Sequence, residues 1–502
     1  MSVPVDSDNL RIEVERIVMG KSRGTTMPAD LVDLTAQLIE FTYYQSVFDP
    51  LIRATLLIND SVNLQYNYPL TGEEIIIVTL NQDYPTGYNS PTSFRPQRYS
   101  LIFCVENIGD VTVADIGKSS SFVMNLVSIE SWPNETQHIS LVNKSSNSTL
   151  KLEDFANYIF KTYIVDELNK MFPTSLYQKY KGTQSRRLLS AGGLSGSTPR
   201  YIHTETTGHD RQNFIIPNLN PIHAIAFCAK HAVATTADNV LDGNHSFLFY
   251  ENLEGFHFRT IEGRIKDEKK AAYASRRQYW YLSNRGLAKK IPQLQNDQFY
   301  EMKLIANMYY NSKYETQSKV VGGYFQNRFV EINMAKQTYS STNTVYSDVR
   351  PTLPRNLTNS RLNTDSYALT KTRAAANDDN LSRVRYNINN FINEEIPDIK
   401  KKWGKSTIHS TALNQIDISI AVPPDINLLP GDVIHINVPL LDSFTDEVVR
   451  DDIMSGYYFI SEAKNVIISD GTSTTSLRLL RDGTDMSIST ANKLRTLGNV
   501  TL

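Results

Sequence analysis

Apolar and polar residues alternate along much of the first 150 residues. Leu10, Ile12 and Val14 alternate with charged residues, and this period of two is typical of a half-buried strand. The segment 31–44 fits a helix or a strand equally well. Because several short strands separated by turns form barrels or sandwiches, we expect one of these over residues 1–150. The other strands predicted there are 53–58, 75–80, 99–105 and 122–126.

The pattern changes near residue 150. Apolar residues three or four apart between Leu152 and Tyr163 predict an amphipathic helix. A second helix is predicted to begin at Asn220-Pro221, since Asn can cap a helix and Pro fits its first position. Between the two helices, residues 181–208 are polar and rich in Gly and Ser, which predicts a mobile loop.

Four phenylalanines follow the second helix, at a spacing of two on either side of a turn at 252–255. Phe247 and Phe249 lie on one arm, and Phe256 and Phe258 lie on the other. We call residues 247–258 the aromatic hairpin and expect its four rings to stack on the second helix. The sequence thus predicts an α+β domain over 151–263.

Residues 264–404 are predicted to form a connecting or inserted segment. Basic and aromatic residues mix at 264–290, which suits a single-stranded nucleic-acid site or, more plainly, a solvated or subunit-contact surface. Residues 338–382 are polar without clear periodicity, so we expect an extended connection there. A helix stopped by Pro397 is predicted next. Its spacing pattern consists of Val384, Ile388, Phe391 and Glu395.

Alternation returns in the last segment, residues 405–502. Leu-Leu-Pro-Gly-Asp at 428–432 predicts a turn between two of the strands. A Gly-acid turn that opens a strand occurs at both 72–78 and 431–437, which is a faint internal repeat. The fold class predicted from the pattern is mainly β with α+β parts. The strands expected at this end are 416–422, 434–438, 457–461 and 477–479.

Composition and charge narrow the function. The 502 residues include 51 Lys and Arg against 53 Asp and Glu, a formal net charge of −2 that argues against a general electrostatic nucleic-acid binder. Cys104 and Cys228 lie in apolar runs and are predicted to be buried, reduced thiols. The longest apolar run, 224–229, is far shorter than a membrane span, and no secretory signal is visible. We expect a soluble protein of cytosolic origin with no integral membrane segment.

The candidate motifs for nucleotide and metal binding lack the residue spacing that such sites require. Gly-Lys-Ser occurs at 20–22, 117–119 and 404–406, each time without the upstream glycine of a P-loop. One predicted helix carries two histidines and a cysteine, but their spacing and the absence of a nearby second ligand pair favour a packed helix over a zinc site. These three residues are His223, Cys228 and His231.

Catalytic arrangements are equally weak. There is no Gly-x-Ser-x-Gly elbow, and His409 beside Ser410 has no evident acidic partner. Glu251 and Glu254 could form an acid–base pair, but they flank a hairpin turn where acids are ordinary. The sequence therefore predicts no catalytic residue, no cofactor and no metal site, and we expect that the chain is not an enzyme.

Three segments together resemble a known family. They are PLIRATLLINDSVNLQYNYPLTGEEIIIVTL at 50–80, the predicted helix at 221–238 with SFLFYENLEGFHFRTIEG at 246–263, and INLLPGDVIHINVP at 426–439 followed by SGYYFISEAKNVI at 455–467. In this order they resemble the baseplate central hub protein of T-even-type contractile-tailed bacteriophages. More distantly, they resemble the hub portion of type VI secretion spike proteins.

The resemblance implies two related tail-tube-like β-barrel domains per chain, one at 1–150 and one with strands from 405–502, plus smaller α+β parts. Three chains would form a pseudo-hexameric ring in the virion tail baseplate, assembled in the host cytoplasm. The ring would adapt the sixfold tail tube to the threefold spike and form part of the DNA ejection channel. Implied partners are two more copies of the chain (a homotrimer), the trimeric tail spike protein, the tail tube or tube-initiator protein, baseplate wedge and tape-measure proteins, and double-stranded DNA in transit.

Two other interpretations stay open. One is the hub of a phage-derived contractile injection system, which would carry a fused or bound effector. The other is a β-rich carbohydrate-binding or carbohydrate-active tail protein, which would need exposed aromatic residues beside paired carboxylates. The chain has three tryptophans, Trp132, Trp280 and Trp403, and none has such neighbours in sequence.

Overall fold

The fold was analysed in a computed structural model of the 502-residue chain. It describes residues 10–21, 31–61, 64–68, 70–85, 88, 95, 97–114, 119–144, 151–171, 201–207, 213–234, 246–265, 267–268, 277–295, 297–313, 322–324, 326–334, 336–345, 383–389, 397–441, 448–451 and 453–483.

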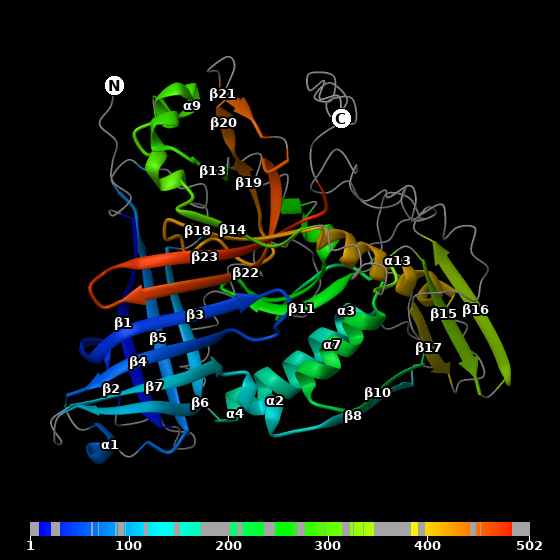
Figure 1. Cartoon of the computed structure of the whole chain (residues 1–502). Helices are drawn as coiled ribbons and strands as arrows, with labels where there is room; N and C mark the ends of the chain where they lie inside the picture. Colours follow the sequence, from blue (N-terminus) through cyan, green and yellow to red (C-terminus); the bar gives the residue numbers. More distant parts are fainter. Residues whose placement is uncertain are drawn as a thin grey trace, which may run out of the picture.

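A 13-stranded sheet dominates these residues (Figure 1). Its pairs are antiparallel except for one short parallel pair, β13 with β19. In sheet order the strands are β14 (Asn307–Lys313), β18 (Ile416–Val422), β23 (Ser473–Arg481), β22 (Gly456–Ile468), β3 (Leu38–Ser46), β4 (Arg53–Asp60), β7 (Ser119–Ser128), β6 (Arg98–Ala114), β5 (Glu74–Asp83), β1 (Arg11–Lys21) and β2 (Val32–Asp33), with β19 (Val433–Asn437) on β22 and β13 (Gln278–Trp280) on β19. The predicted mainly β class is confirmed.

Strands from the two ends of the chain meet within this sheet. The β22 residues 462–468 pair antiparallel with β3 residues 40–46. Phe41 and Tyr43 of β3 point to one buried face, where Phe41 lies 6.3 Å from Phe103 between ring centroids. Ile467 of β22 joins the same core. The segment 31–44, ambiguous in sequence, is therefore strand for the most part, because its aromatic and branched residues fit a sheet surface.

Beside the sheet lies an α+β region. Helix α3 (Leu152–Phe160) continues through a π-helical turn (Lys161–Val165) into α4 (Asp166–Met171), and α3 packs against α7 (Pro221–His231). The aromatic hairpin consists of β11 (Phe247–Asn252) and β12 (Gly255–Thr260), with β9 (Ile202–Thr204) parallel to β12. Both helices and the start of α7 at Pro221 were predicted, and these predictions are confirmed.

The aromatic hairpin is core, as predicted. All four of its phenylalanines are buried, in one cluster with the inner face of α7. Their ring partner on the helical side is Phe160 of α3, 4.6 Å from Phe256 and 6.4 Å from Phe249 between centroids. Stacking therefore involves α3 as well as the helix that the sequence indicated. Cys104 and Cys228 are buried in the same cluster, and neither is in a disulfide.

Three predictions in the middle of the chain are wrong. The segment from Val384 is not helical: β17 (Arg383–Asn389) is a strand parallel to β15 (Gln326–Asn333), because the same apolar residues also fit a period of two. Pro397 begins α13 (Pro397–Leu413) rather than ending a helix, a position that tolerates its missing N–H. The expected extended connection begins instead with a hairpin strand, β16 (Thr338–Val345).

Phe391, Glu395 and residues 346–382 lie outside the described residues, as do 181–200 and 208 of the predicted mobile loop. Residues 202–204 of that loop are ordered as β9. The three-stranded sheet of β15, β16 and β17 packs against α13, so the inserted segment carries a small α+β unit of its own.

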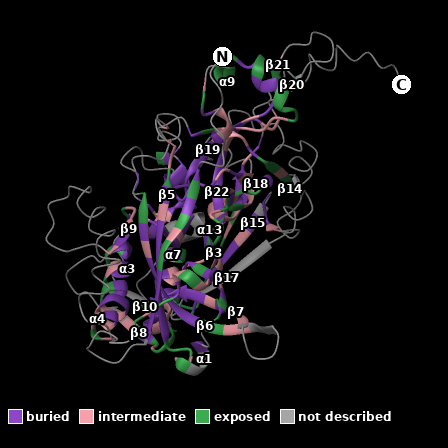
Figure 2. Cartoon of the chain, turned by 90° about the vertical axis from the view of Figure 1, so that its left-hand side faces the viewer, coloured by how far each residue is buried: buried purple, intermediate pink, exposed green. Residues whose placement is uncertain are grey.

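Short elements complete the described chain. Exposed residues gather around α9 and β21, whereas the strands of the large sheet are mostly buried (Figure 2). No helix among the described residues has the length and apolar character needed to cross a bilayer. The short elements are α1 (Leu64–Asn67), α2 (Ser131–Glu135), β8 (Ile139–Lys144), β10 (Asn213–Leu219), α9 (Pro292–Gln295), β20 (Pro439–Leu441), β21 (Val448–Arg450) and the 3-10 turns at Thr35–Gln37, Arg285–Lys290 and Tyr300–Lys303.

Candidate functional site: a buried ionic junction

The turn between β18 and β19 is buried from its second residue onward. Every residue from 424 to 434 is buried, and this buried turn contains the Leu-Leu-Pro-Gly-Asp sequence. Connecting segments usually run over the surface, since water can then satisfy their backbone groups. Here the rest of the chain must supply those partners instead.

The strands of the N-terminal part hold the first half of the buried turn. Gln82 of β5 accepts from the backbone N–H of Ile426 at 2.9 Å and donates to the carbonyl of Pro424 at 3.3 Å. Tyr99 of β6 donates its hydroxyl to Oδ1 of Asn427 at 2.7 Å. Arg95 donates to the Asn427 carbonyl at 2.6 Å. Residues more than 300 positions apart in sequence thus satisfy each other's polar groups.

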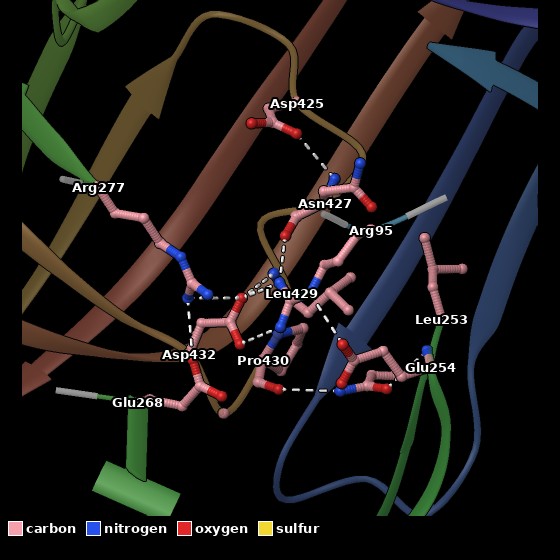
Figure 3. A network of polar contacts seen from close by, with 12 residues as sticks. Arg95, Leu253, Glu254, Glu268, Arg277, Asp425, Asn427, Leu429, Pro430 and Asp432 are labelled. Carbon is pink, nitrogen blue, oxygen red and sulfur yellow. Dashed lines mark hydrogen bonds and ion pairs between the residues drawn. The ribbon is translucent and has the colours of Figure 1, made fainter. Parts of the chain in front are cut away.

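Asp432 closes the buried turn and is the centre of an ionic cluster (Figure 3). Its side chain is 0% exposed and contacts three guanidinium groups. Arg95 binds both carboxylate oxygens, with Nη2 2.8 Å from Oδ1, while Arg264 lies at 3.2 Å and Arg277 at 3.4 Å. Burial alone would raise the pKa of Asp432, but Arg95 and the two other arginines outweigh it and hold that pKa far below its usual range.

Two glutamates balance the remaining positive charge. Glu254, at the tip of the aromatic hairpin, lies 2.8 Å from Arg95 and 3.5 Å from Arg264. Glu268 lies 3.0 Å from Arg277 and 3.3 Å from Arg264. Three arginines and three carboxylates therefore form a charge-neutral cluster, in which no side chain is more than 16% exposed. We call these six residues together with the buried turn the ionic junction.

A glycine is required within the junction. Gly431 has φ +96°, a conformation that other residues rarely adopt. A Cβ at this position would lie 2.5 Å from the hydroxyl oxygen of Tyr250 and 3.2 Å from Nε of Arg264. The carbonyl of Gly431 accepts from the same Nε at 3.2 Å. The close approach of Arg264 and Tyr250 therefore depends on the missing side chain.

The junction corrects part of the interpretation of the basic segment 264–290. We expected a solvated or subunit-contact surface there, and residues 283–286, 289 and 290 are exposed. Arg264 and Arg277, however, face inward, and Arg277 is only 1% exposed. Sequence reasoning also missed Arg95. That residue stands in a polar stretch, 89–98, without periodicity, so nothing local indicated that it would be buried.

The residues considered as catalytic or metal-binding candidates do not form such a site. Cys228 is buried within α7, and burial raises the pKa of its thiol. Glu251 accepts from Ser128 Oγ at 2.5 Å and from the backbone of Ile52 at 3.0 Å, away from the ion pairs of Glu254. Among the described residues, no group of three or more His, Cys, Asp and Glu is placed to hold a metal ion.

His409 does have an acidic partner, contrary to expectation. Its Nδ1 lies 2.9 Å from Oε1 of Glu262, which also accepts from Ser246 Oγ at 2.7 Å. Burial raises the pKa of Glu262, but the hydrogen bonds from His409 and Ser246 outweigh it and lower the pKa to about 2. Ser410 is not part of this pair, since its Oγ donates to the carbonyl of Thr407 at 3.2 Å. The pair links α13 to the segment after the aromatic hairpin.

The Gly-Lys-Ser at 404–406 has a packing role. It lies inside α13, where Gly404 faces Thr344 of β16 with no room for a Cβ. Gly20 and Lys21 end β1, and residues 117–118 lie outside the described part of the chain. Neither of the described copies forms a loop that could wrap a phosphate.

Comparisons with known proteins return phage tail and secretion components among solved structures. No protein-family model matches the chain, and no curated protein matches it. A tail protein of Neisseria meningitidis MC58 aligns with a TM-score of 0.46 and 9% identity over 94% of this chain and 96% of its own. The 43 kDa tail protein of prophage MuSo2 from Shewanella oneidensis aligns with 0.44 and 9%, over 94% and 99%.

A third structure is an E. coli component of the type VI secretion system, described as structurally similar to the T4 tail proteins gp27 and gp5. It aligns with a TM-score of 0.37 and 6% identity, over 95% of this chain and 79% of its own. All three TM-scores are below 0.5.

Proposed function

We propose that the chain is the central hub protein of a contractile phage tail baseplate, a structural component without catalytic activity. The observation that carries the proposal is the ionic junction. The aromatic hairpin and the Leu-Leu-Pro-Gly-Asp turn, which carry most of the family resemblance, meet there through Glu254, Asp432 and their shared arginines. The resemblance thus concerns residues that hold the fold together.

The proposed architecture has two tail-tube-like barrels per chain. Strands β1 to β7 would form the first, within residues 1–150, and strands of the 405–502 segment with β13 and β14 would form the second. The α+β domain at 151–263 and the inserted segment at 264–404 lie between them in sequence. Barrels suit a ring that carries load, because closure removes exposed strand edges and leaves loops free for specific contacts.

Three chains would form the ring, with six barrels giving pseudo-sixfold symmetry around a channel. One side would bind the tail tube or tube-initiator protein and the other the trimeric spike, with wedge and tape-measure proteins as further contacts. DNA would pass through the channel after contraction. We expect a lumen that is not strongly basic, because tight phosphate binding would slow DNA. A ring structure with a lumen lined by Lys and Arg would contradict that expectation.

The test is the mass in solution by light scattering, followed by negative-stain class averages. The proposal predicts a particle of three times 56.9 kDa with a ring-shaped top view. A chain that is monomeric alone is then mixed with the spike protein encoded beside it, and ring formation only in the mixture also supports the hub role. A chain that stays monomeric in both samples is not a hub.

The same architecture would serve a phage-derived contractile injection system. The two roles differ in what the particle carries, so mass spectrometry of purified particles separates them. Capsid protein and DNA in the same particles indicate a virion, whereas a bound effector without a capsid indicates an injection device.

A further inference from the structure

Each chain segment that enters the ionic cluster brings one net charge. Arg95 brings +1 and Glu254 brings −1. From the segment 264–277, Arg264, Glu268 and Arg277 enter the cluster and contribute +1, and Asp432 contributes −1. Asp425, the other acid of the buried turn, is not one of the six, and its Oδ1 accepts from the backbone of Asn427 at 2.9 Å.

This balance of charges makes partial docking of the four segments unfavourable. If any one of the four segments is withdrawn, the remaining cluster keeps a net unit charge in a largely buried site. An uncompensated buried charge is strongly destabilising, whereas a complete, charge-balanced pair is close to neutral. The junction should therefore form with all four segments or not at all.

Two of the four segments come from opposite ends of the chain. Arg95 connects to the strands of residues 10–144, whereas Asp432 lies between strands of residues 416–481. The ladder between β3 and β22 joins the same two parts at the sheet. A sheet ladder can open one residue pair at a time, but the charged cluster cannot open in steps without exposing a charge imbalance.

We propose that the ionic junction couples residues 10–144 and 416–481, so that they unfold in one cooperative transition, and that Asp432 is the residue on which this coupling depends. The proposal concerns the monomer fold and does not rest on the hub role. It assigns the neutrality of the cluster to cooperativity between the two ends of the chain rather than to overall stability.

The test uses the tryptophans as local reporters. The double variant Trp280→Phe/Trp403→Phe keeps Trp132, which packs beside the core of the α+β region at α2. The double variant Trp132→Phe/Trp403→Phe keeps Trp280 of β13, which pairs with β19. Urea unfolding is followed by fluorescence in each background, at two protein concentrations so that any subunit dissociation is recognised by its concentration dependence.

With the cluster intact, we expect the two reporters to give the same midpoint. Asp432→Asn should separate the midpoints by about 0.5 to 1 M urea, because each part then unfolds with its own stability. Glu268→Gln is the milder second variant if Asp432→Asn does not fold, and it should separate them by less. Asp432→Asn/Arg277→Gln restores neutrality and should bring the midpoints together again.

The matched control is Asp417→Asn, which removes a carboxylate 2.7 Å from Arg478 on β23, outside the junction. It should lower both midpoints equally. The proposal is overturned if the reporters already disagree with the intact cluster. It is also overturned if they agree in every junction variant, or if Asp417→Asn separates them as much as Asp432→Asn does.

Discussion

The body and the tip of the aromatic hairpin are both buried, but by different physics. The body packs phenylalanine rings against α3 and α7, where contacts are numerous and non-directional. The tip inserts Glu254 between Arg95 and Arg264, where each contact has a fixed partner and a fixed sign. The body therefore supplies stability, and the tip determines which segment of the chain it docks against.

The largest expected effect on stability is at Asp432, which shares Arg95 and Arg264 with Glu254 at the hairpin tip. Asp432→Ala leaves three buried arginines with too little negative charge and should lower the free energy of unfolding by about 5 kcal/mol. Urea denaturation measures it. If the loss is below about 1 kcal/mol, the cluster is accessible to water or counterions, and the contrast with the hairpin body fails.

The body should come next. Phe249→Ala removes a buried ring that packs on Phe160 and Phe256, and should cost about 3 to 4 kcal/mol. Calorimetry should show a lower Tm. Phe249→Leu is the matched control, since it keeps an apolar side chain in the site and should retain most of the stability. An unchanged Tm in Phe249→Ala would place the hairpin outside the core.

Low pH should distinguish a buried charged side chain from a buried apolar one. The pKa of Glu262 falls from 4.5 to about 2 in the fold, so the contacts of its carboxylate with His409 and Ser246 stabilise the fold above pH 4.5, and this stabilisation is lost as pH falls toward 2. Glu262→Gln should therefore cost about 2 to 3 kcal/mol at neutral pH and little near pH 2. The cost of Phe249→Ala should be the same at both pH values, because a ring does not titrate. Equal pH dependence in the two variants would contradict the assignment.

A smaller effect on stability is expected at Gly431, where the backbone conformation rather than a charge constrains the junction. Gly431→Ala should cost about 1 to 2 kcal/mol, from its φ of +96° and from contact with the hydroxyl of Tyr250. Tyr250→Phe removes that hydroxyl. A double-mutant cycle in urea should show that the two changes together cost less than the sum of each alone; strict additivity would leave only the backbone term.

The smallest effect is expected at the surface. Arg53 pairs with Asp49 at 3.3 Å and Glu106 at 3.2 Å, but its side chain is 53% exposed. Arg53→Ala should change the free energy of unfolding by less than about 0.5 kcal/mol. The same urea assay, with Asp432→Ala measured alongside, tests whether burial rather than the number of ion pairs determines how much stability is lost.

Periodicity made the hairpin body and most strands predictable. Phe247, Phe249, Phe256 and Phe258 repeat at a spacing of two around a turn, so local sequence already indicated a buried face. The same method failed after residue 383, because apolar residues at 384 and 388 fit both a helix and a strand. There the partner β15, more than 50 residues earlier, selects the strand.

The ionic junction was not predictable in the same way. Arg95, Arg264 and Arg277 look like surface residues in their own segments, and only the fold brings them to Asp432. The sequence did indicate the turn at 428–432, through its Pro and Gly. It could not show that this turn is buried, because burial there depends on donors from β5 and β6, far away in the chain.

The pairing of β3 with β22 also has a consequence for synthesis on the ribosome. The two strands are separated by roughly 400 residues, and translation proceeds at about 5 to 20 residues per second. For tens of seconds, β3 of a nascent chain must wait beside β4 with its other edge open, at a stage when an exposed edge can pair with neighbouring chains. A lower growth temperature, or a chaperone that shields this edge, should therefore change the yield of soluble chain more than it changes the stability of the folded protein.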